Sequence, residues 1–312
     1  MDKKRVGILR GGQHDYENSL QKGGELILHI TDKLGDKWQV FDIFIDKNNI
    51  WHLAGKEIKP ALLMHKVDVV WNLAHPSFSN VLQSFSIPVI GHENFSNFIG
   101  ESRALLEEHM KQIGVKMPKH LIIPVYQKDF DARPDERNHP FGRGEEYKFV
   151  IKKAKEVHEK FSAPWIVQSL NKNSNMGIHV AETFPELERA IEDMVNHGES
   201  ILVEEFISGK NAEMHSVSNF RGEDIYTFPA GNFSKEEKEK LTYLAEDLHK
   251  LFHIKSYLNS QFVLHPKKGI YLTSVNFCPD LKNDSTFNES CISVGAKMHH
   301  VVEHMLEKVI GA

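Results

Sequence analysis

The first 95 residues alternate short apolar runs with helical patterns, and this order restricts the fold more than any other feature of the chain. Apolar runs at 6–9, 38–45, 67–71 and 87–90 have the length of buried strands. Residues 19–34, between the first two runs, have helical spacing with a polar face. Strands that alternate with helices form a mostly parallel, doubly wound sheet. We therefore predict an N-terminal α/β substrate-binding domain over residues 1–95.

Two further blocks, 96–207 and 208–312, mix strands and helices in a different order. In the central block we predict helices and strands in the order 103–113 (helix), 165–170 (strand), 177–181 (strand), 184–195 (helix) and 201–206 (strand). In the last block we predict strands at 214–218, 225–228, 261–264 and 270–275, and helices at 235–252 and 294–309. This order is typical of α+β domains. The fold class is therefore α/β followed by α+β.

A polar, charge-rich stretch at 127–146 runs into a lysine-rich helical pattern at 147–161. We interpret 127–161 as an insertion in the central domain, a surface loop that leads into an exposed helix. Lys152, Lys153 and Lys155 should then point outward. A contact of these lysines with nucleic acid or a protein partner is the less favoured alternative, because the net charge of −5 gives no global bias toward nucleic acid or anionic membranes.

The remaining composition predicts a cytoplasmic protein. No run approaches the roughly 18 apolar residues of a spanning helix, and the start, MDKKRVGIL, lacks the apolar core of a secretory signal. Cys278 and Cys291 are too few for a disulfide framework and fit a reducing compartment. His300 and His304 would share a helix face, and a solvated face is favoured there over a metal site.

A series of motif-like segments extends along the chain. In order, they are ILRGGQHDYENSL (8–20), VVWNLAHPSFSNVLQSFSIPVIGHE (69–93), IGESRALLEEHMKQIGVKMPKHLII (99–123), SAPWIVQSLNKNSNMGIHV (162–180), ILVEEFISGKNAE (201–213) and YLNSQFVLHPKKGIYLTSVNFCPDLKNDSTF (257–287). Gly11 and Gly12 would let the backbone turn sharply after a strand, close to a bound substrate. Each segment alone is weak evidence, and their common order is the specific signal.

In this order the segments resemble the D-alanine–D-alanine ligase family of the ATP-grasp superfamily, over nearly the whole chain outside 127–161. The resemblance implies a preATP-grasp-like N-terminal domain followed by a two-part ATP-grasp fold. The family's activity is ADP-forming, ATP-dependent carboxylate–amine ligation, with ATP and Mg²⁺ as cofactors. It also implies a small-molecule ligand, an amino acid or a nucleotide, and a homodimer formed through the N-terminal block.

The resemblance assigns roles to individual positions. The family's substrate-binding positions fall on Glu17, His75, Ser174 and Ser285. Its nucleotide-binding positions fall on Arg103, Gln168, Glu204, Phe206, Ile207 and Asn211. Glu17, His75 and Ser285 also have ordinary structural interpretations, as a charge at a helix start, a buried histidine and a helix cap.

Several of these positions depart from the family's chemistry. Gln168 replaces a phosphate-binding lysine, and Gln261 and Ser274 replace two metal-binding carboxylates, while Asn276 is retained. Mg²⁺ prefers anionic oxygen ligands, so this set is poor. Asn259 stands at the position of an arginine that stabilises the oxyanion. Loss of one such donor typically lowers the rate by about 10²–10³.

We therefore expect a D-alanine–D-alanine ligase-like protein that keeps a ligand-binding cleft but has little or no ordinary ligase turnover. The cleft should be lined by Gln168, Glu204, Phe206, Gln261 and Asn276. The alternative is an active ATP-dependent carboxylate–amine ligase with a rearranged site. In that alternative, Asp280, Asp284 or Glu213 would supply the anionic metal ligands.

Overall fold

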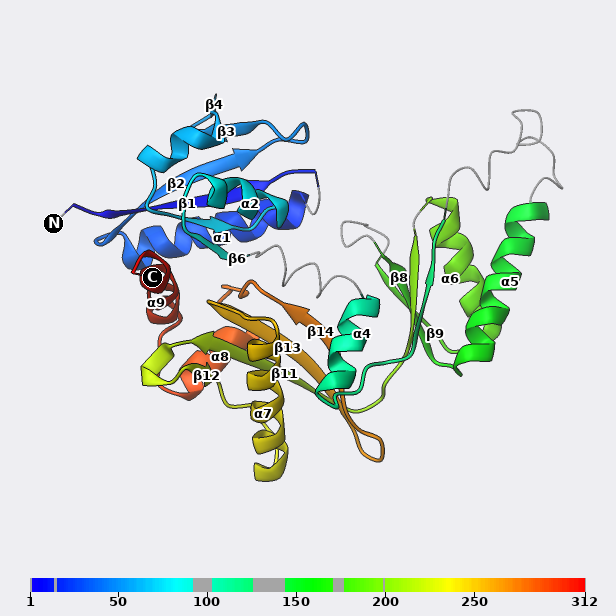
Figure 1. Cartoon of the computed structure of the whole chain (residues 1–312). Coiled ribbons are helices and arrows are strands. Elements are labelled where there is room, and N and C mark those ends of the chain that lie inside the picture. Colours follow the sequence, from blue (N-terminus) through cyan, green and yellow to red (C-terminus); the bar gives the residue numbers. More distant parts are fainter. Residues whose placement is uncertain are drawn as a thin grey trace, which may run out of the picture. The chain divides into compact units, whose positions relative to one another are not determined.

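The computed structural model describes residues 2–13, 16–91, 103–125, 144–170, 177–198 and 200–311. It divides into two compact units (Figure 1), one formed by Met1–Lys116 with Gly209–Ala312 and the other by Met117–Ser208. The first and last blocks of the sequence thus share the larger unit. The finer division into three domains stays a prediction. None of the helices in the described part of the chain has the length and apolar character needed to cross a bilayer.

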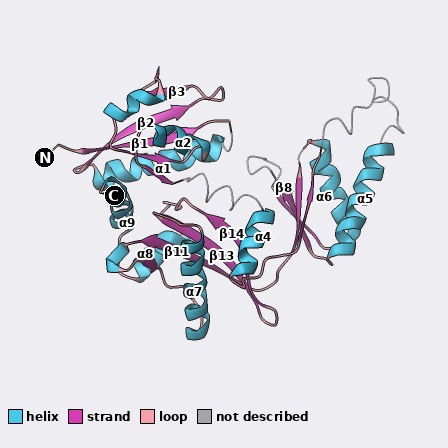
Figure 2. Ribbon diagram, in the orientation of Figure 1, coloured by secondary structure: helices cyan, strands magenta, loops and turns pink. Residues whose placement is uncertain are grey.

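The N-terminal part of the larger unit is a six-stranded sheet in the order β4-β3-β2-β1-β5-β6. Figure 2 draws strands in magenta and helices in cyan. The strands β1 (Lys4–Gly11), β2 (Trp38–Ile45), β5 (Val69–Asn72) and β6 (Val89–Gly91) are parallel. Each contains or overlaps one of the predicted apolar runs. Two short antiparallel strands that the sequence did not reveal, β3 (Trp51–Leu53) and β4 (Lys56–Glu57), extend one edge.

Helices cover both faces of this sheet. On one face, α1 (Tyr16–Leu34) packs Leu26 and Ile30 in the same core as Val6 and Ile8 of β1. On the other face, the short helix η1 (Pro60–His65) and α2 (Ser77–Ser84) enclose a second core that contains Leu9. Residues 6 and 8 alternate with residue 9 because successive side chains of a strand point to opposite faces. The doubly wound prediction is confirmed.

A second sheet in the larger unit is antiparallel, in the order β12-β11-β13-β14. Its strands are β11 (Lys210–Ser218), β12 (Ile225–Thr227), β13 (Tyr257–His265) and β14 (Gly269–Asn276). Helix α7 (Lys235–Leu251) begins in a capping box of Ser234 and Glu237 and lies on one face. Helix α8 (Thr286–Ser293) packs Phe287 on the other face, against His215 and Tyr257.

The chain ends in α9 (Met298–Ile310), which packs on α1, β5 and β6 (Figure 1). We predicted one final helix over 294–309, and its start was wrong. The structure has two helices, α8 and α9, and Gly295 between them has a φ of +67° that a continuous helix does not allow. Helix α4 (Arg103–Gln112) also belongs to this unit, and η3 (Phe220–Gly222) lies between β11 and β12.

The smaller unit is an antiparallel sheet in the order β7-β10-β8-β9, with two helices on one face. The strands are β7 (His120–Ile123), β8 (Trp165–Ser169), β9 (Ile178–Ala181) and β10 (Ile201–Glu205). The helices are α5 (Gly144–Lys160) and α6 (Phe184–Asn196), and α6 begins in a capping box of Thr183 and Glu186. The predicted hairpin of β8 and β9 is confirmed by their antiparallel pairing.

Helix α5 is more deeply packed than the sequence suggested. Lys152 and Lys155 are exposed as predicted, but Lys153 is partly buried and pairs with Glu156 at 2.8 Å. The opposite side of α5, with Ala154 and Val157, is fully buried in the core of the unit. The interpretation of the whole helix as a peripheral feature was wrong, because apolar residues at helical spacing outweigh the many lysines. The polar loop over 126–143 lies outside the described residues.

Candidate functional site

Two loops at the carboxyl ends of β1 and β5 carry the first predicted site residues. Gly11 and Gly12 both have positive φ, and a Cβ on Gly11 would lie 2.2 Å from the Ile45 carbonyl oxygen. The Ser19 hydroxyl of α1 accepts a hydrogen bond from the Gly11 amide at 2.9 Å and donates to the Leu73 carbonyl at 2.8 Å. This serine fixes the helix start to both strand ends. Glu17 lies exposed in the first turn of that helix.

His75 lies just beyond β5, at the edge of the sheet where the carboxyl ends of β1 and β5 meet. Its Nδ1 is 2.8 Å from the Ser77 hydroxyl, and its ring meets Phe78 edge-on. Glu17 and His75 therefore follow neighbouring parallel strands, the usual place for ligands in such sheets. Their role in substrate binding stays a prediction.

Ser285 has a clear structural task. Its hydroxyl accepts a hydrogen bond from the Asn288 amide at 3.2 Å and caps the start of α8. The capping interpretation of Ser285 is therefore confirmed. Of the other predicted positions, Ser174 and the side chain of Arg103 lie outside the described residues.

In the smaller unit, Gln168 of β8 and Glu204 of β10 form a pair. Gln168 Nε2 donates a hydrogen bond to Glu204 Oε2 at 2.9 Å. Residues 165, 167, 201 and 203 point toward α5 and α6, so Gln168 and Glu204 lie on the face that neither helix covers. Phe206, 40% exposed, and the buried Ile207 follow directly after β10. Asn211 is the second residue of β11 and belongs to the larger unit.

The antiparallel sheet of the larger unit brings four predicted positions together. Asn259 lies opposite Asn276, and Gln261 lies opposite Ser274, on the neighbouring strands β13 and β14. The Ser274 hydroxyl donates to Gln261 Oε1 at 2.9 Å. Asn276 Oδ1 accepts a hydrogen bond from the Cys278 amide at 3.0 Å. The polar groups of this set are therefore bonded largely within the protein.

Asn259 is part of a buried polar network that the sequence did not predict. Its Nδ2 donates to Glu213 Oε1 and lies 3.2 Å from His215 Nδ1, which is 2.7 Å from the Tyr257 hydroxyl. Burial lowers the pKa of His215 to about 4 and raises the pKa of Tyr257 well above its ordinary value. The imidazole is therefore neutral, and its Nδ1 lies within hydrogen-bond distance of both neighbours, with the donor set by the tautomer. The amide nitrogen of Asn259 thus lies against Glu213 and His215.

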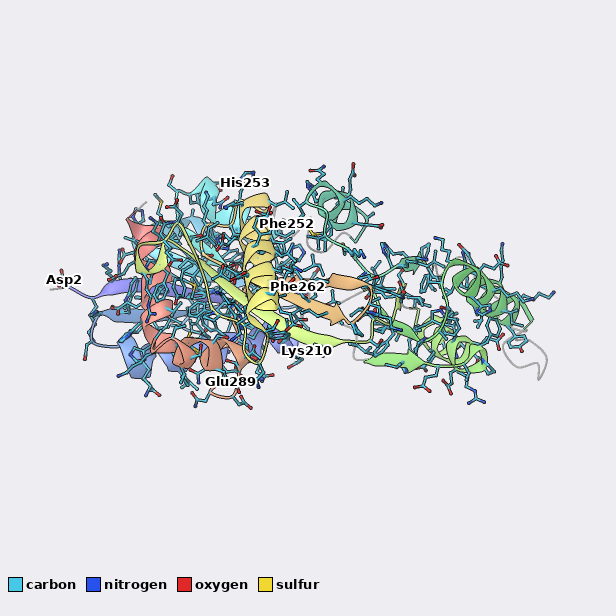
Figure 3. The ribbon with its side chains drawn as sticks, turned by 90° about the horizontal axis from the view of Figure 1, so that it is seen from below. Asp2, Lys210, Phe252, His253, Phe262 and Glu289 are labelled. Carbon is cyan, nitrogen blue, oxygen red and sulfur yellow. The ribbon has the colours of Figure 1, made fainter. Side chains whose placement is uncertain are left out.

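A cavity of about 640 Å³ opens beside this network, entirely within the larger unit. Its walls come from β11, β13 and β14, from the segment 229–233, and from α8. The lining residues are Asn211, Ala212, Glu213, Pro229, Gly231, Phe233, Gln261, Phe262, Val263, Thr273, Thr286, Glu289, Ser290 and Ser293. Lys210, Phe262 and Glu289, on β11, β13 and α8, mark this region in Figure 3.

Comparisons with known proteins agree on one family. Residues 140–227 match the family model described as D-ala D-ala ligase C-terminus. The D-alanine–D-alanine ligase of Borrelia garinii is 21% identical over 362 residues, which cover 97% of this chain and 95% of the relative. That of Ruminiclostridium cellulolyticum is 20% identical, with 98% and 95% covered.

Solved structures with a similar fold include other ligases of this kind. D-alanyl-alanine synthetase A from Vibrio cholerae has a TM-score of 0.75 at 15% identity, with all of both chains covered. The VanG D-Ala:D-Ser ligase from Enterococcus faecalis has a TM-score of 0.74 at 15% identity, with 99% and 100% covered. The chain is similar to the D-alanine–D-alanine ligase family over nearly its whole length. Its doubly wound N-terminal sheet is followed by an ATP-grasp fold, as predicted. The family match also includes α5, which we had placed in an insertion.

Members of this family depend on ATP, and a relative from Bacillus anthracis has been solved in complex with ATP. The donor set of this chain does not fit the Mg²⁺ that accompanies ATP. Gln261, Ser274 and Asn276 supply neutral oxygens, and those of Gln261 and Asn276 already accept hydrogen bonds. In the part of the chain that the structure describes, no group of three or more His, Cys, Asp or Glu side chains could hold a metal ion.

The alternative metal ligands do not complete such a set. Glu213 is bonded to Asn259, and Asp280 Oδ1 accepts a hydrogen bond from the Lys282 amide at 3.1 Å, which makes Asp280 a turn residue. Asp284 is exposed, and neither aspartate lines the cavity. His304 Nε2 contacts the Ser218 carbonyl oxygen at 2.9 Å, while the His300 ring meets the His299 ring edge-on. Those two histidines therefore have separate structural contacts.

Proposed function

We propose that this chain is a D-alanine–D-alanine ligase-like ATP-grasp protein that binds a small molecule and has little or no ordinary ligase turnover. The carrying observation is the Gln261–Ser274 pair. At positions where the family resemblance implies metal-binding carboxylates, the two side chains are hydrogen-bonded to each other. A neutral pair gives Mg²⁺ no anionic oxygen, and the Gln261 carbonyl oxygen already accepts one hydrogen bond.

The network around Asn259 supports the same proposal. An oxyanion must be met by preorganised donors that are free to point at it. The amide nitrogen of Asn259 donates to Glu213 and lies 3.2 Å from His215 Nδ1 instead. Gln168 is neutral and therefore adds no positive charge for phosphates. Its amide donates to Glu204 instead. Metal binding, oxyanion stabilisation and phosphate binding therefore each lack the side chain that the family resemblance implies.

The decisive experiment measures phosphate release and calorimetric ATP binding, with and without Mg²⁺ and D-alanine. We expect the unmodified chain to release no phosphate above background and to show no Mg²⁺-dependent heat of ATP binding. Gln261→Asp combined with Ser274→Glu should create Mg²⁺-dependent nucleotide binding. Turnover should require Asn259→Arg in addition, because a metal does not replace the oxyanion donor.

A matched control adds the same two carboxylates elsewhere. Gln21→Asp combined with Ser84→Glu changes the net charge equally at exposed helix positions and should leave nucleotide binding unchanged. Robust Mg²⁺-dependent ligation by the unmodified chain would overturn the proposal. That result would favour the alternative, an active carboxylate–amine ligase that uses Glu213, Asp280 or Asp284 as relocated ligands.

The proposal includes a cytoplasmic homodimer formed through residues 1–95. Two buried thiols, Cys278 and Cys291, support a reducing compartment. Sedimentation analysis tests the assembly. A monomer at micromolar concentration would remove the dimer from the proposal and leave the ligand-binding function standing.

A further inference from the structure

The cavity beside β11 and β13 is a suitable size for a small ligand. Its volume of about 640 Å³ lies inside the range of roughly 300–1,000 Å³ that is usual for small-molecule sites. All of its walls belong to the larger unit, so its shape does not depend on the smaller one. Phe233 and Val263 supply apolar surface, and Asn211 and Thr273 supply neutral polar groups.

The charged side chains that line the cavity are all negative. Glu213 and Glu289 both line the cavity, and the lining residues, all of which are described, include no Lys, Arg or His. Lys210 does not line the cavity, although its ammonium lies 4.6 Å from the ring centroid of the lining residue Phe233, and it is 3.7 Å from a Glu237 oxygen. An anionic ligand would therefore meet like charges here, whereas a cation would be attracted.

Glu213 is held with one oxygen available. Asn259 donates to Oε1, and within the described part of the chain no donor bonds to Oε2. Asn259 is only 5% exposed and is fixed in turn by His215 and Tyr257, so the carboxylate is oriented before any ligand arrives. Among the described residues, the buried Asn259 Oδ1 has no hydrogen-bond donor, so the oxygen beside Glu213 carries an uncompensated partial negative charge.

We propose that this cavity binds a small organic amine in its ammonium form, with Glu213 as the counter-ion. The inference rests on the proposed function and deepens it, because it names a class of ligand for a cavity that Gln261 of the same site lines. A single ammonium group satisfies the open Glu213 oxygen by a charge-assisted hydrogen bond and needs no further anionic ligand. Mg²⁺ would need several hard, preferably anionic oxygens in octahedral order, which these walls do not provide.

The test is calorimetric titration of the full chain with 1,4-diaminobutane, and with 1,4-butanediol as a neutral molecule of the same length. We expect the diamine to bind and the diol not to bind. Glu213→Gln removes the charge but keeps the oxygen that accepts from Asn259, so the fold should survive. A hydrogen bond to a charged group contributes about 1.5–3 kcal/mol, so the affinity should fall about 10- to 100-fold.

Glu223→Gln is the matched control, since Glu223 is an exposed glutamate of the same unit that does not line the cavity. It should bind the diamine like the unmodified chain, and both variants should keep the thermal midpoint. No diamine binding, equal binding by Glu213→Gln, or displacement of the diamine by millimolar MgCl₂ would overturn the inference. Phosphate release from ATP is measured separately, so turnover would contradict the proposed function without deciding whether the amine binds.

Discussion

Gln168 in the smaller unit and Asn259 in the larger one each place an amide against a glutamate, at positions where the family resemblance implies a cation. Gln168 is partly exposed and donates at 2.9 Å to Glu204, which is 6% exposed, on the sheet face that neither helix covers. Asn259 is 5% exposed and connects Glu213 to the buried His215 and Tyr257. The same type of substitution therefore has two very different surroundings.

The difference shows that the stability cost of changing a substituted residue depends on how deeply that residue is buried. A side chain at a partly exposed position such as 168 can be exchanged at smaller cost, because water replaces what the new side chain itself leaves unpaired. A buried network has no such replacement, and each member left without a partner costs its full desolvation energy. The larger unit should thus resist changes at its polar residues, whereas the smaller unit should tolerate them.

The largest expected effect is a selective acid weakening of the larger unit. Burial lowers the pKa of His215 and of His249 to about 4. Because the unfolded chain binds protons with a higher pKa, near 6.5, stability falls as the pH drops from 6.5 toward 4. Each histidine should cost about 2 kcal/mol between pH 7 and pH 5. Hydrogen exchange, corrected for intrinsic rates, should show that the protection of β11 and β13 falls by the sum of the two contributions.

His249→Leu is the control for this acid effect, since His249 lies between Ser216 and Ser218, away from the cavity. The variant should lose about half of the pH dependence in β11 and β13. Strands β8 and β10 of the smaller unit serve as the internal reference. An equal loss of protection in both units would remove the distinction between them.

The next effect in size is that of Asn259→Asp. The new carboxylate would lie against Glu213 in a buried position and could not donate to it, so the unit should lose about 3 kcal/mol of stability at pH 8. Crowding of two carboxylates raises their folded-state pKa, so the deficit relative to the unmodified chain should shrink at pH 5. Urea denaturation at both pH values measures this, and a deficit below about 1 kcal/mol at pH 8 would contradict a closed network.

Much of the fold could be predicted because its strands are continuous apolar runs. The run at 38–45 corresponds to β2 without any shift. Short, polar elements gave no such signal: α2 (SFSNVLQS) and α8 (TFNESCIS) have few apolar residues and were missed. Helix α5 was placed correctly but assigned the wrong environment, since its three buried positions are outnumbered by charged ones.

The candidate site was predictable only where the resemblance supplied the positions. That Asn259, Gln261, Ser274 and Asn276 are neighbours followed from the segment order, and the register of β13 and β14 agrees. His215 could not be predicted as a partner of Asn259. Which cross-strand residues meet depends on register, and a shift of one residue reverses every side chain. The binding roles of these residues stay predictions.

A smaller effect should follow from Gln168→Glu, the counterpart of Asn259→Asp. It also places a carboxylate against a glutamate, Glu204, but on a partly exposed sheet face. Water can solvate the second charge, so the loss should be about 1 kcal/mol at pH 8. Thermal unfolding of both variants at equal ionic strength gives the comparison. If Gln168→Glu costs as much as Asn259→Asp, the environment is not what distinguishes the two sites.

The smallest effect is expected for Gln168→Lys, which restores a cation in the smaller unit. The ammonium can pair with Glu204, and a partly exposed pair contributes only about 0–1 kcal/mol, so stability should change by less than about 1 kcal/mol. Since Glu204 neutralises much of the new charge, the affinity for ATP without Mg²⁺ should rise no more than about fivefold. Gln168→Met, which has similar length and no charge, is the control and should show no gain. A rise of a hundredfold or more would mean that the missing lysine alone prevents nucleotide binding, and that the smaller unit rather than the neutral sheet of the larger one limits the chemistry.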